Sequence, residues 1–217
     1  MKKIIIYMLL ALPLPLIAQF GIKGGLNFAN VTKASSINNS SRTGFHAGLF
    51  LAPPTQGVMG FRTEFIFSRQ GYDYKSNTNT GKVNLDYIML PQLMCINITK
   101  FFQIQLGGQM AYLVSAKADS SSGTGSGGSG NKIMDLYNRF DFGYGGGIEI
   151  HPVSGLIIGA RFNVSLGDLY KDMSDAVPGT MPGFIPKVDV KNNVFQVSAG
   201  WRFGKQSNSK KNKKDDQ

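Results

Sequence analysis

Hydrophobic and polar positions alternate along most of this 217-residue chain. Between residues 61 and 68, for example, phenylalanines at odd positions alternate with Arg62, Glu64 and other residues at even positions. A period of two predicts a β-strand with one apolar and one polar face. Seven segments show this pattern clearly: 20–29, 45–52, 61–68, 102–112, 140–150, 158–166 and 195–203.

An eighth strand is predicted over residues 83–98 from its length and composition. Its faces are ambiguous, because Asp86 shares one face with Ile88 while Tyr87 shares the other with Met89. The sequence therefore leaves open which face of this strand points inward.

The connections between these strands alternate in length. Short ones fall at 53–59, 99–100 and 152–155, and long polar ones at 32–43, 75–82, 115–138 and 167–191. The third long connection contains a Gly/Ser-rich run, 120–130, which is expected to be mobile. This order predicts an all-β, eight-stranded antiparallel up-and-down meander within one domain, residues 19–204.

Composition decides between a membrane barrel and a soluble one. The chain has 27 glycines, 15 phenylalanines and only 17% charged residues, and no long apolar run beyond its first 18 residues. A bundle of membrane helices is excluded, because each helix needs about 20 consecutive apolar residues. Eight strands enclose a space just wide enough for side chains, and the phenylalanines of the apolar face would overfill it. The apolar face should therefore point outward to lipid, which predicts a transmembrane β-barrel.

The two ends of the chain differ from the barrel. Residues 1–18 combine Lys2 and Lys3 with an apolar core and two prolines, which predicts an export signal cut after Ala18. Residues 205–217 predict a basic, disordered tail. Both ends contribute to the net charge of +10, so this charge does not indicate a nucleic-acid partner. Cys95 is the single cysteine, which excludes an intramolecular disulfide.

Several segments resemble the PorT-type outer-membrane β-barrel family of Bacteroidota. They include GIKGGLNFANV (21–31), YIMLPQL (87–93), DFGYGGGIEI (141–150) and GARFNVSLGDL (159–169). The resemblance implies a Gram-negative outer-membrane location among lipid and lipopolysaccharide. It also implies that the last strand, ending in Trp201 and Phe203, is recognised by the barrel-assembly machinery.

Ionisable residues on the inward face are the main candidate site. The predicted lumen polar network comprises Lys23, Arg62, Glu64, Asp141, Glu149, Arg161 and Arg202. Charged groups inside a barrel must form ion pairs or remain in contact with water. Two interpretations stay open: an ion-pair plug that fills the barrel, or a narrow path that favours anions.

Aromatic residues near the strand ends predict two interfacial girdles. They are Phe20, Phe28, Tyr72, Tyr74, Tyr137, Trp201 and Phe203.

Catalytic chemistry has little support in the sequence. His46 and His151 are expected near opposite membrane faces. A site that combines His46 with Asp141 or with a loop serine is the remaining hypothesis for a hydrolase or acyltransferase. No GxSxG, HExxH or Walker pattern is present. The run GYGGG (143–147) lies within a predicted strand and indicates tight curvature rather than phosphate binding. We therefore expect no enzyme activity, cofactor or metal.

The leading functional hypothesis is a structural or interaction barrel that is not an open pore. A protein partner would bind through loop 167–191, which is unusually apolar and could instead cover the barrel mouth, or through the tail 205–217. Two alternatives are a component of a PorT-like secretion or envelope-assembly complex, and a barrel that binds a small ligand or forms a narrow pore.

Overall fold

The computed structural model describes residues 20–32, 38–53, 57–75, 80–120, 134, 136–170 and 191–203. The predicted export signal, the tail, the low-complexity run after Ser120 and most of loop 167–191 lie outside the described residues.

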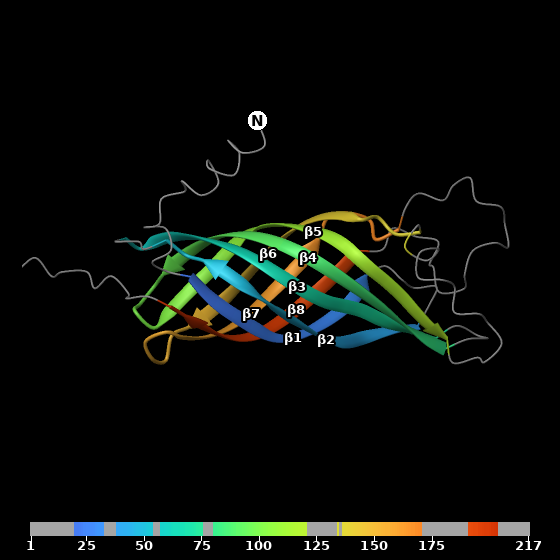
Figure 1. Ribbon diagram of the computed structural model, residues 1–217, viewed down its shortest axis with the longest axis horizontal. Helices are drawn as coiled ribbons and strands as arrows, with labels where there is room; N and C mark the ends of the chain where they lie inside the picture. Colours follow the sequence, from blue (N-terminus) through green and yellow to red (C-terminus); the bar gives the residue numbers. More distant parts are fainter. Residues whose placement is uncertain are drawn as a thin grey trace, which may run out of the picture.

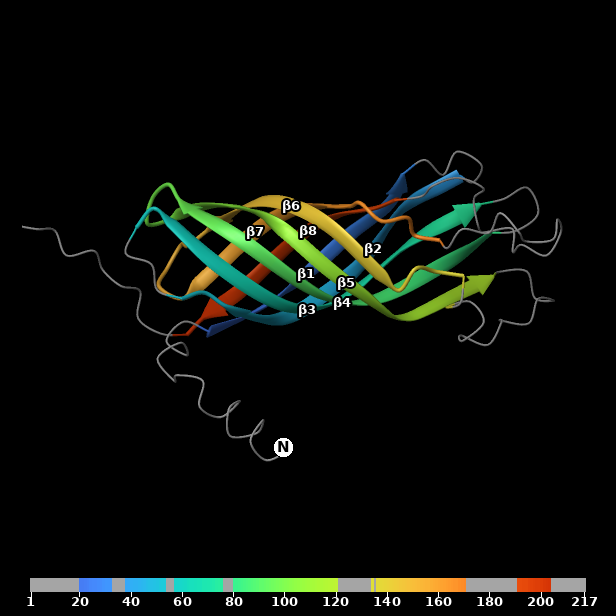
Figure 2. The same cartoon turned by 90° about the horizontal axis from the view of Figure 1, so that it is seen from above.

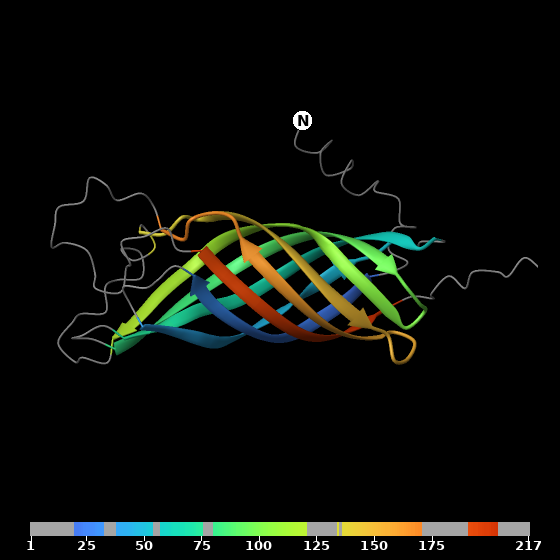
Figure 3. The same ribbon diagram turned by 180° about the vertical axis from the view of Figure 1, so that it is seen from behind.

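Eight strands form one closed barrel in which each strand is antiparallel to the next and β8 returns to β1. Figure 1 shows the tilted strands around the barrel, and Figure 3 shows the closure, with β8 beside β1. The predicted eight-stranded antiparallel barrel is therefore confirmed. Among the described residues, no helix is long and apolar enough to cross a membrane. The strands are β1 (Phe20–Thr32), β2 (Asn38–Leu51), β3 (Met59–Lys75), β4 (Thr80–Asn97), β5 (Phe102–Ser120), β6 (Phe140–Ile150), β7 (Leu156–Ser165) and β8 (Lys191–Arg202).

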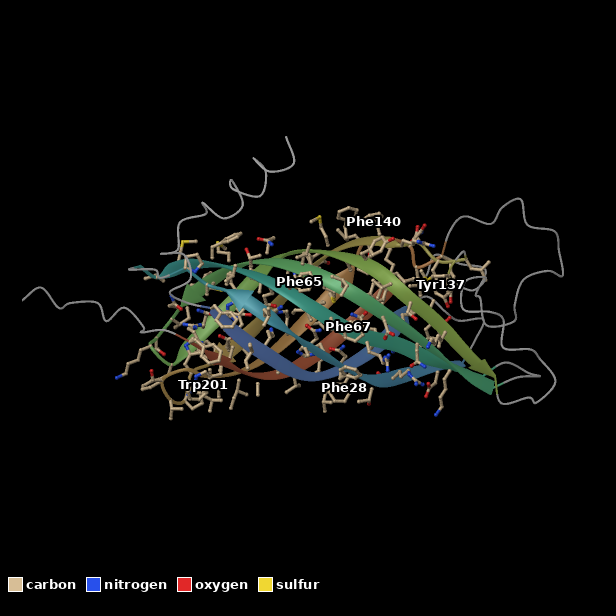
Figure 4. All side chains as sticks on the ribbon, viewed as in Figure 1. Phe28, Phe65, Phe67, Tyr137, Phe140 and Trp201 are labelled. Atoms are coloured by element: carbon tan, nitrogen blue, oxygen red, sulfur yellow. The ribbon has the colours of Figure 1, made fainter. Side chains whose placement is uncertain are left out.

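The apolar face of the strands points outward. On β3, Phe61 and Phe65 are 55% and 51% exposed, whereas the intervening Arg62 and Glu64 are fully buried. Figure 4 shows the labelled side chains of Phe28, Phe140 and Trp201 on the outside of the ribbon. Because closure pairs the backbone of every strand, such an apolar exterior can face lipid without unsatisfied edges.

Strand β4 has its odd-numbered residues inside. Tyr87, Met89 and Leu93 are buried, and Leu90 and Met94 are exposed on the outer face. Asp86 interrupts the alternation of β4, because it is a charged residue on the outer face, which is apolar in the other strands. Its carboxylate accepts hydrogen bonds from Arg69 Nε and Nη2, at 2.7 and 3.0 Å.

Strands β2 to β5 project beyond the others at the end that carries the long connections, where Asn38–Ser41 of β2 pair with Tyr72–Lys75 of β3. β5 continues to Ser120, but its pairing with β6 stops at Tyr112 and Phe140. Figure 2 shows β3, β4 and β5 reaching past β6, β7 and β8 at this end. We call residues 69–75, 80–86 and 113–120 the extension. Strand residues 80–82 and 115–120 replace part of the predicted connections 75–82 and 115–138, and Ala116 is buried on the inner face.

Candidate functional site in the barrel interior

Glu64 lies at the centre of a charged layer near the short-turn end. It accepts hydrogen bonds from Arg161 Nη1 and Nη2 at 2.7 and 2.9 Å, and from Lys23 Nζ at 3.2 and 3.3 Å. β3 and β7 are four strands apart in a ring of eight, so they form opposite walls. The Glu64–Arg161 pair therefore crosses the full width of the lumen.

Glu149 on β6 is the second anionic centre. Arg62 donates to its two oxygens from Nη1 and Nη2, at 2.6 and 2.8 Å. Gln105 Nε2 donates to the same carboxylate at 2.9 Å, and His151 Nε2 lies 2.8 Å from it. The Arg62 guanidinium also lies over the ring of Phe50, 4.7 Å from its centroid. Bidentate guanidinium–carboxylate bonds are among the stronger hydrogen bonds in proteins.

Gln105 joins the two carboxylate centres into one network. Its side-chain oxygen accepts from Arg161 Nη2 at 2.7 Å, while its amide nitrogen donates to Glu149. Buried ions lose their hydration, which costs free energy. A network in which each charge is paired and hydrogen-bonded offsets that cost. The charged layer comprises Lys23, Arg62, Glu64, Gln103, Gln105, Glu149, His151, Arg161 and Arg202.

Inward glycines make room for these long side chains. Gly147 pairs in register with Gln105 on one side and with Arg161 on the other. A Cβ at Gly147 would lie 2.3 Å from the Ala160 carbonyl oxygen and 2.8 Å from the Arg161 Cα. The glycine run within β6 is thus a packing feature: small residues stand beside large ones in a narrow barrel.

A layer of neutral side chains lies farther along the barrel. Asn27 donates to Ser68 Oγ and to the Arg69 carbonyl oxygen, both at 2.9 Å. Its side-chain oxygen accepts from Gln196 Nε2 at 3.0 Å and lies 2.8 Å from His46 Nδ1. Since that oxygen is an acceptor, His46 carries its proton on Nδ1. His46 is therefore held in a structural network.

An apolar cap fills the interior at the long-connection end. Tyr170 and Tyr72 are joined by a hydrogen bond between their hydroxyl groups, and the rings of Tyr137 and Tyr170 lie 4.9 Å apart. Asn138 Nδ2 donates to the Tyr170 carbonyl oxygen at 2.9 Å, which ties the segments beside β6 and β7 together. Burial raises the pKa of Tyr137 and Tyr170 well above its usual value. The cap comprises Ile66, Tyr72, Val83, Leu85, Tyr87, Met89, Ala111, Leu113, Ala116, Tyr137, Leu169 and Tyr170.

The comparisons with known proteins agree with this architecture. The family model described as "Outer membrane protein beta-barrel domain" matches residues 15–171. The chain belongs to this outer-membrane β-barrel family. Its short turns then face the periplasm and its long connections the cell exterior, as is usual for such barrels. No curated protein matches the chain in sequence.

Three solved structures, of two proteins, illustrate what this outer-membrane barrel is similar to. Ail, the attachment invasion locus protein of Yersinia pestis, has 15% identity and a TM-score of 0.48, covering 86% of this chain and 99% of Ail. Neisserial surface protein A (NspA) has 12% identity and a TM-score of 0.44, covering 85% of this chain and 97% of NspA. Another Ail structure, in complex with the heparin analogue sucrose octasulfate, has 19% identity and a TM-score of 0.47, covering 85% of this chain and 98% of Ail.

Six of the seven residues predicted for the lumen network lie together in the charged layer. The exception is Asp141, at the other end of β6 from Glu149. It accepts from Ser165 Oγ at 2.7 Å and from the Gly167 amide at 3.2 Å. Gln103 and Gln105 were missed because they are uncharged, although they alternate with apolar neighbours on β5 as the charged residues do elsewhere.

The prediction that Tyr72 and Tyr137 belong to an aromatic girdle is wrong. Both are fully buried in the apolar cap, because the inner face of the barrel is apolar from Ile66 and Met89 through to the extension. The side chain of Tyr74 lies outside the described residues. The other predicted aromatics lie at the strand ends of this outer-membrane barrel, where Phe20 stacks on Phe203 at 5.2 Å and Phe28 lies 6.3 Å from Phe195. Trp201 is exposed at the periplasmic end.

The hypothesis of a His46–Asp141 catalytic pair has no geometric support. His46 is bonded to Asn27, while Asp141 is bonded to Ser165 and Gly167. Among the described residues, no cluster of three or more His, Cys, Asp or Glu side chains could hold a metal ion.

Proposed function

We propose that this protein is a closed structural and interaction barrel that does not conduct ions or solutes and carries no catalytic activity. The observation that carries the proposal is the Glu64–Arg161 pair, which joins opposite walls of the lumen. The apolar cap adds a second seal at the extracellular end. With both levels filled, recognition takes place on the exterior of the barrel.

The extension is the surface best suited to recognition. It lifts three paired strands above the membrane and is braced from inside by Tyr72, Tyr137 and Tyr170. Its outer side carries exposed charged residues such as Lys82 and Lys117. Binding residues commonly lie on the loops that a rigid scaffold of this kind connects. We propose that a protein partner binds this surface, and that loop 167–191 contributes to the contact.

Site-specific photocrosslinking in intact cells tests this function. A crosslinking residue at Lys82 or Lys117 should give a discrete adduct, whereas one at the lipid-facing Phe65 should give none. A matched periplasmic position is the exposed Val153. Absence of adducts at both extension positions would contradict the proposal. Adducts at Val153 alone would favour the second candidate below.

The second candidate is a PorT-like component of a protein secretion or envelope-assembly complex. The segments quoted above favour it, notably YIMLPQL on β4 and GARFNVSLGDL from β7 onward. It requires export through the signal 1–18 and insertion by the barrel-assembly machinery. It also requires stoichiometric partners that copurify in mild detergent, through loop 167–191 or the tail 205–217. Purification of the barrel alone under those conditions would exclude it.

A further inference from the structure

The charged layer holds more positive than negative charge. Lys23, Arg62, Arg161 and Arg202 face two carboxylates, those of Glu64 and Glu149, which leaves an excess of two positive charges when His151 is neutral. The carboxylate of Asp141 is eight residues away from Glu149 along β6, about 26 Å at the usual rise per residue. Unbalanced charge in a low-dielectric interior is costly, so a counter-ion is expected near the least satisfied cation.

Arg202 is that cation. Arg62 and Arg161 each make two short bonds to a carboxylate. Arg202 has only a 3.8 Å approach from Nη2 to Glu149 Oε1, and its buried Nε has no hydrogen-bond partner among the described residues. The buried Nε atoms of Arg62 and Arg161 also have no partner among the described residues, so Arg202 differs in its Nη atoms, which make no short bond to a carboxylate and are left as donors at the periplasmic end of the barrel.

A small cavity lies beside Arg202 at the periplasmic mouth. Its volume is about 120 Å³, and Lys100, His151, Ser154 and Arg202 supply its polar lining. A water molecule occupies about 30 Å³, so this space holds a phosphate-sized group. Lys100 is exposed at the rim, with its ammonium 4.8 Å from the ring centroid of Phe101. Two cationic side chains and one that carries a hydroxyl group thus line a cavity of suitable size.

We propose that this cavity is a binding site for a phosphate-type oxyanion. Arg202 offers a planar pair of donors and Lys100 a point charge, the combination commonly used for phosphate. The bound anion balances the excess charge of the layer. Apolar residues exposed around the cavity, among them Phe101 and Val153, place it at the membrane surface. The phosphate can therefore come from a lipid headgroup of the inner leaflet or from the periplasmic solution. The site is independent of the extracellular function proposed above.

Calorimetric titration of the full-length refolded barrel, in a phosphate-free maltoside detergent, tests the site with inorganic phosphate. We expect saturable binding that R202Q abolishes and K100Q weakens at least tenfold. R139Q removes an exposed arginine at the opposite end and should leave the affinity unchanged. If R202Q does not refold, K100Q decides, because its side chain is exposed. Equal affinity in wild type and K100Q would overturn the proposal.

A second titrant, a short-chain phosphatidylglycerol below its micellar concentration, distinguishes the two sources. Binding at least tenfold tighter than that of inorganic phosphate, and sensitive to K100Q, supports a lipid headgroup. Comparable binding of the two, with the same sensitivity, supports a soluble anion. Failure of both titrants to bind the wild-type barrel would overturn the site.

Discussion

Glu64 on β3 and Arg161 on β7 bond through both guanidinium Nη atoms across the full diameter of the barrel. The two residues are 97 positions apart in the chain, and neither has another carboxylate or guanidinium so well placed. Their bond fixes the distance between opposite walls of the lumen. In the closed barrel that we propose, stability and closure are therefore coupled.

E64Q should strongly destabilise the barrel, because it leaves Lys23 and Arg161 buried without their carboxylate. We expect a loss of about 3–5 kcal/mol in the free energy of unfolding, and a similar loss for R161Q. In the double variant the losses should fall short of additivity by about 1–3 kcal/mol. Urea unfolding in lipid vesicles measures the free energy of unfolding of the two single variants and the double variant. The control is R42Q, which breaks the more exposed Arg42–Asp73 pair and should cost about 0–1 kcal/mol. Additive losses would contradict the direct coupling.

Gly147 should not tolerate even a methyl group. A Cβ there would meet the Ala160 carbonyl oxygen at 2.3 Å, so G147A should cost about 1–3 kcal/mol through overpacking. The matched control is G108A, whose Cβ would have its nearest neighbour at 3.8 Å, and which should change stability by no more than about 0.5 kcal/mol. The same unfolding assay compares them. If G147A and G108A lower the free energy of unfolding equally, then lack of space at Gly147 does not explain the glycine there.

The apolar cap should control the extension separately from the rest of the barrel. Y170A removes a buried ring that contacts Tyr72 and Tyr137, and a loss of about 3–5 kcal/mol is expected for a large aromatic core residue. Amide hydrogen exchange over residues 113–120 should accelerate, while exchange near Glu64 stays slow. The control F140A alters an exposed ring and should leave both regions protected. Uniform acceleration throughout the barrel would contradict a separate cap.

Alkaline pH should open the cap. Burial raises the pKa of Tyr137 and Tyr170 above the ordinary value of about 10, so their protonated form is favoured in the folded state. Their contribution to stability is fully present below pH 10 and is lost as the pH rises through the folded-state pKa. Hydrogen exchange of the extension at rising pH, corrected for the intrinsic rate, measures this loss. The double variant Y137F/Y170F keeps Tyr72 and Tyr87 in the cap and should show a smaller loss. An identical pH dependence would exclude the phenols of Tyr137 and Tyr170 as its cause.

Most of the fold could be predicted from the alternation of the chain. Residues such as Phe65 and Arg62 differ so strongly in polarity that each strand has one obvious face. The volume of an eight-stranded interior then requires the phenylalanines to face lipid. The faces of β4 could not be assigned in the same way. Its outer face carries the charged Asp86 and its inner face the apolar Tyr87 and Met89, the reverse of the other strands. Only the position of Arg69 on the neighbouring strand explains why Asp86 can lie outside.

The interior site was predictable in part. Charged residues on a polar face must pair, which identified Glu64, Arg161 and their partners. The cap could not be predicted, because an apolar inner face violates the rule that membrane barrels alternate apolar-out and polar-in. Tyr72 and Tyr137 do not follow that rule, since they pack inside the barrel with other buried apolar residues such as Met89.

Ion conductance of the purified full-length barrel in planar lipid bilayers tests most directly whether the lumen is closed. With Glu64 and Arg161 joining opposite walls, we expect no current steps from the wild type. The variant E64A/R161A/Y170A, which removes the pair across the charged layer and one ring of the apolar cap, serves as the comparison with both levels weakened. Discrete and reproducible single-channel steps from the wild-type barrel would contradict the closed lumen.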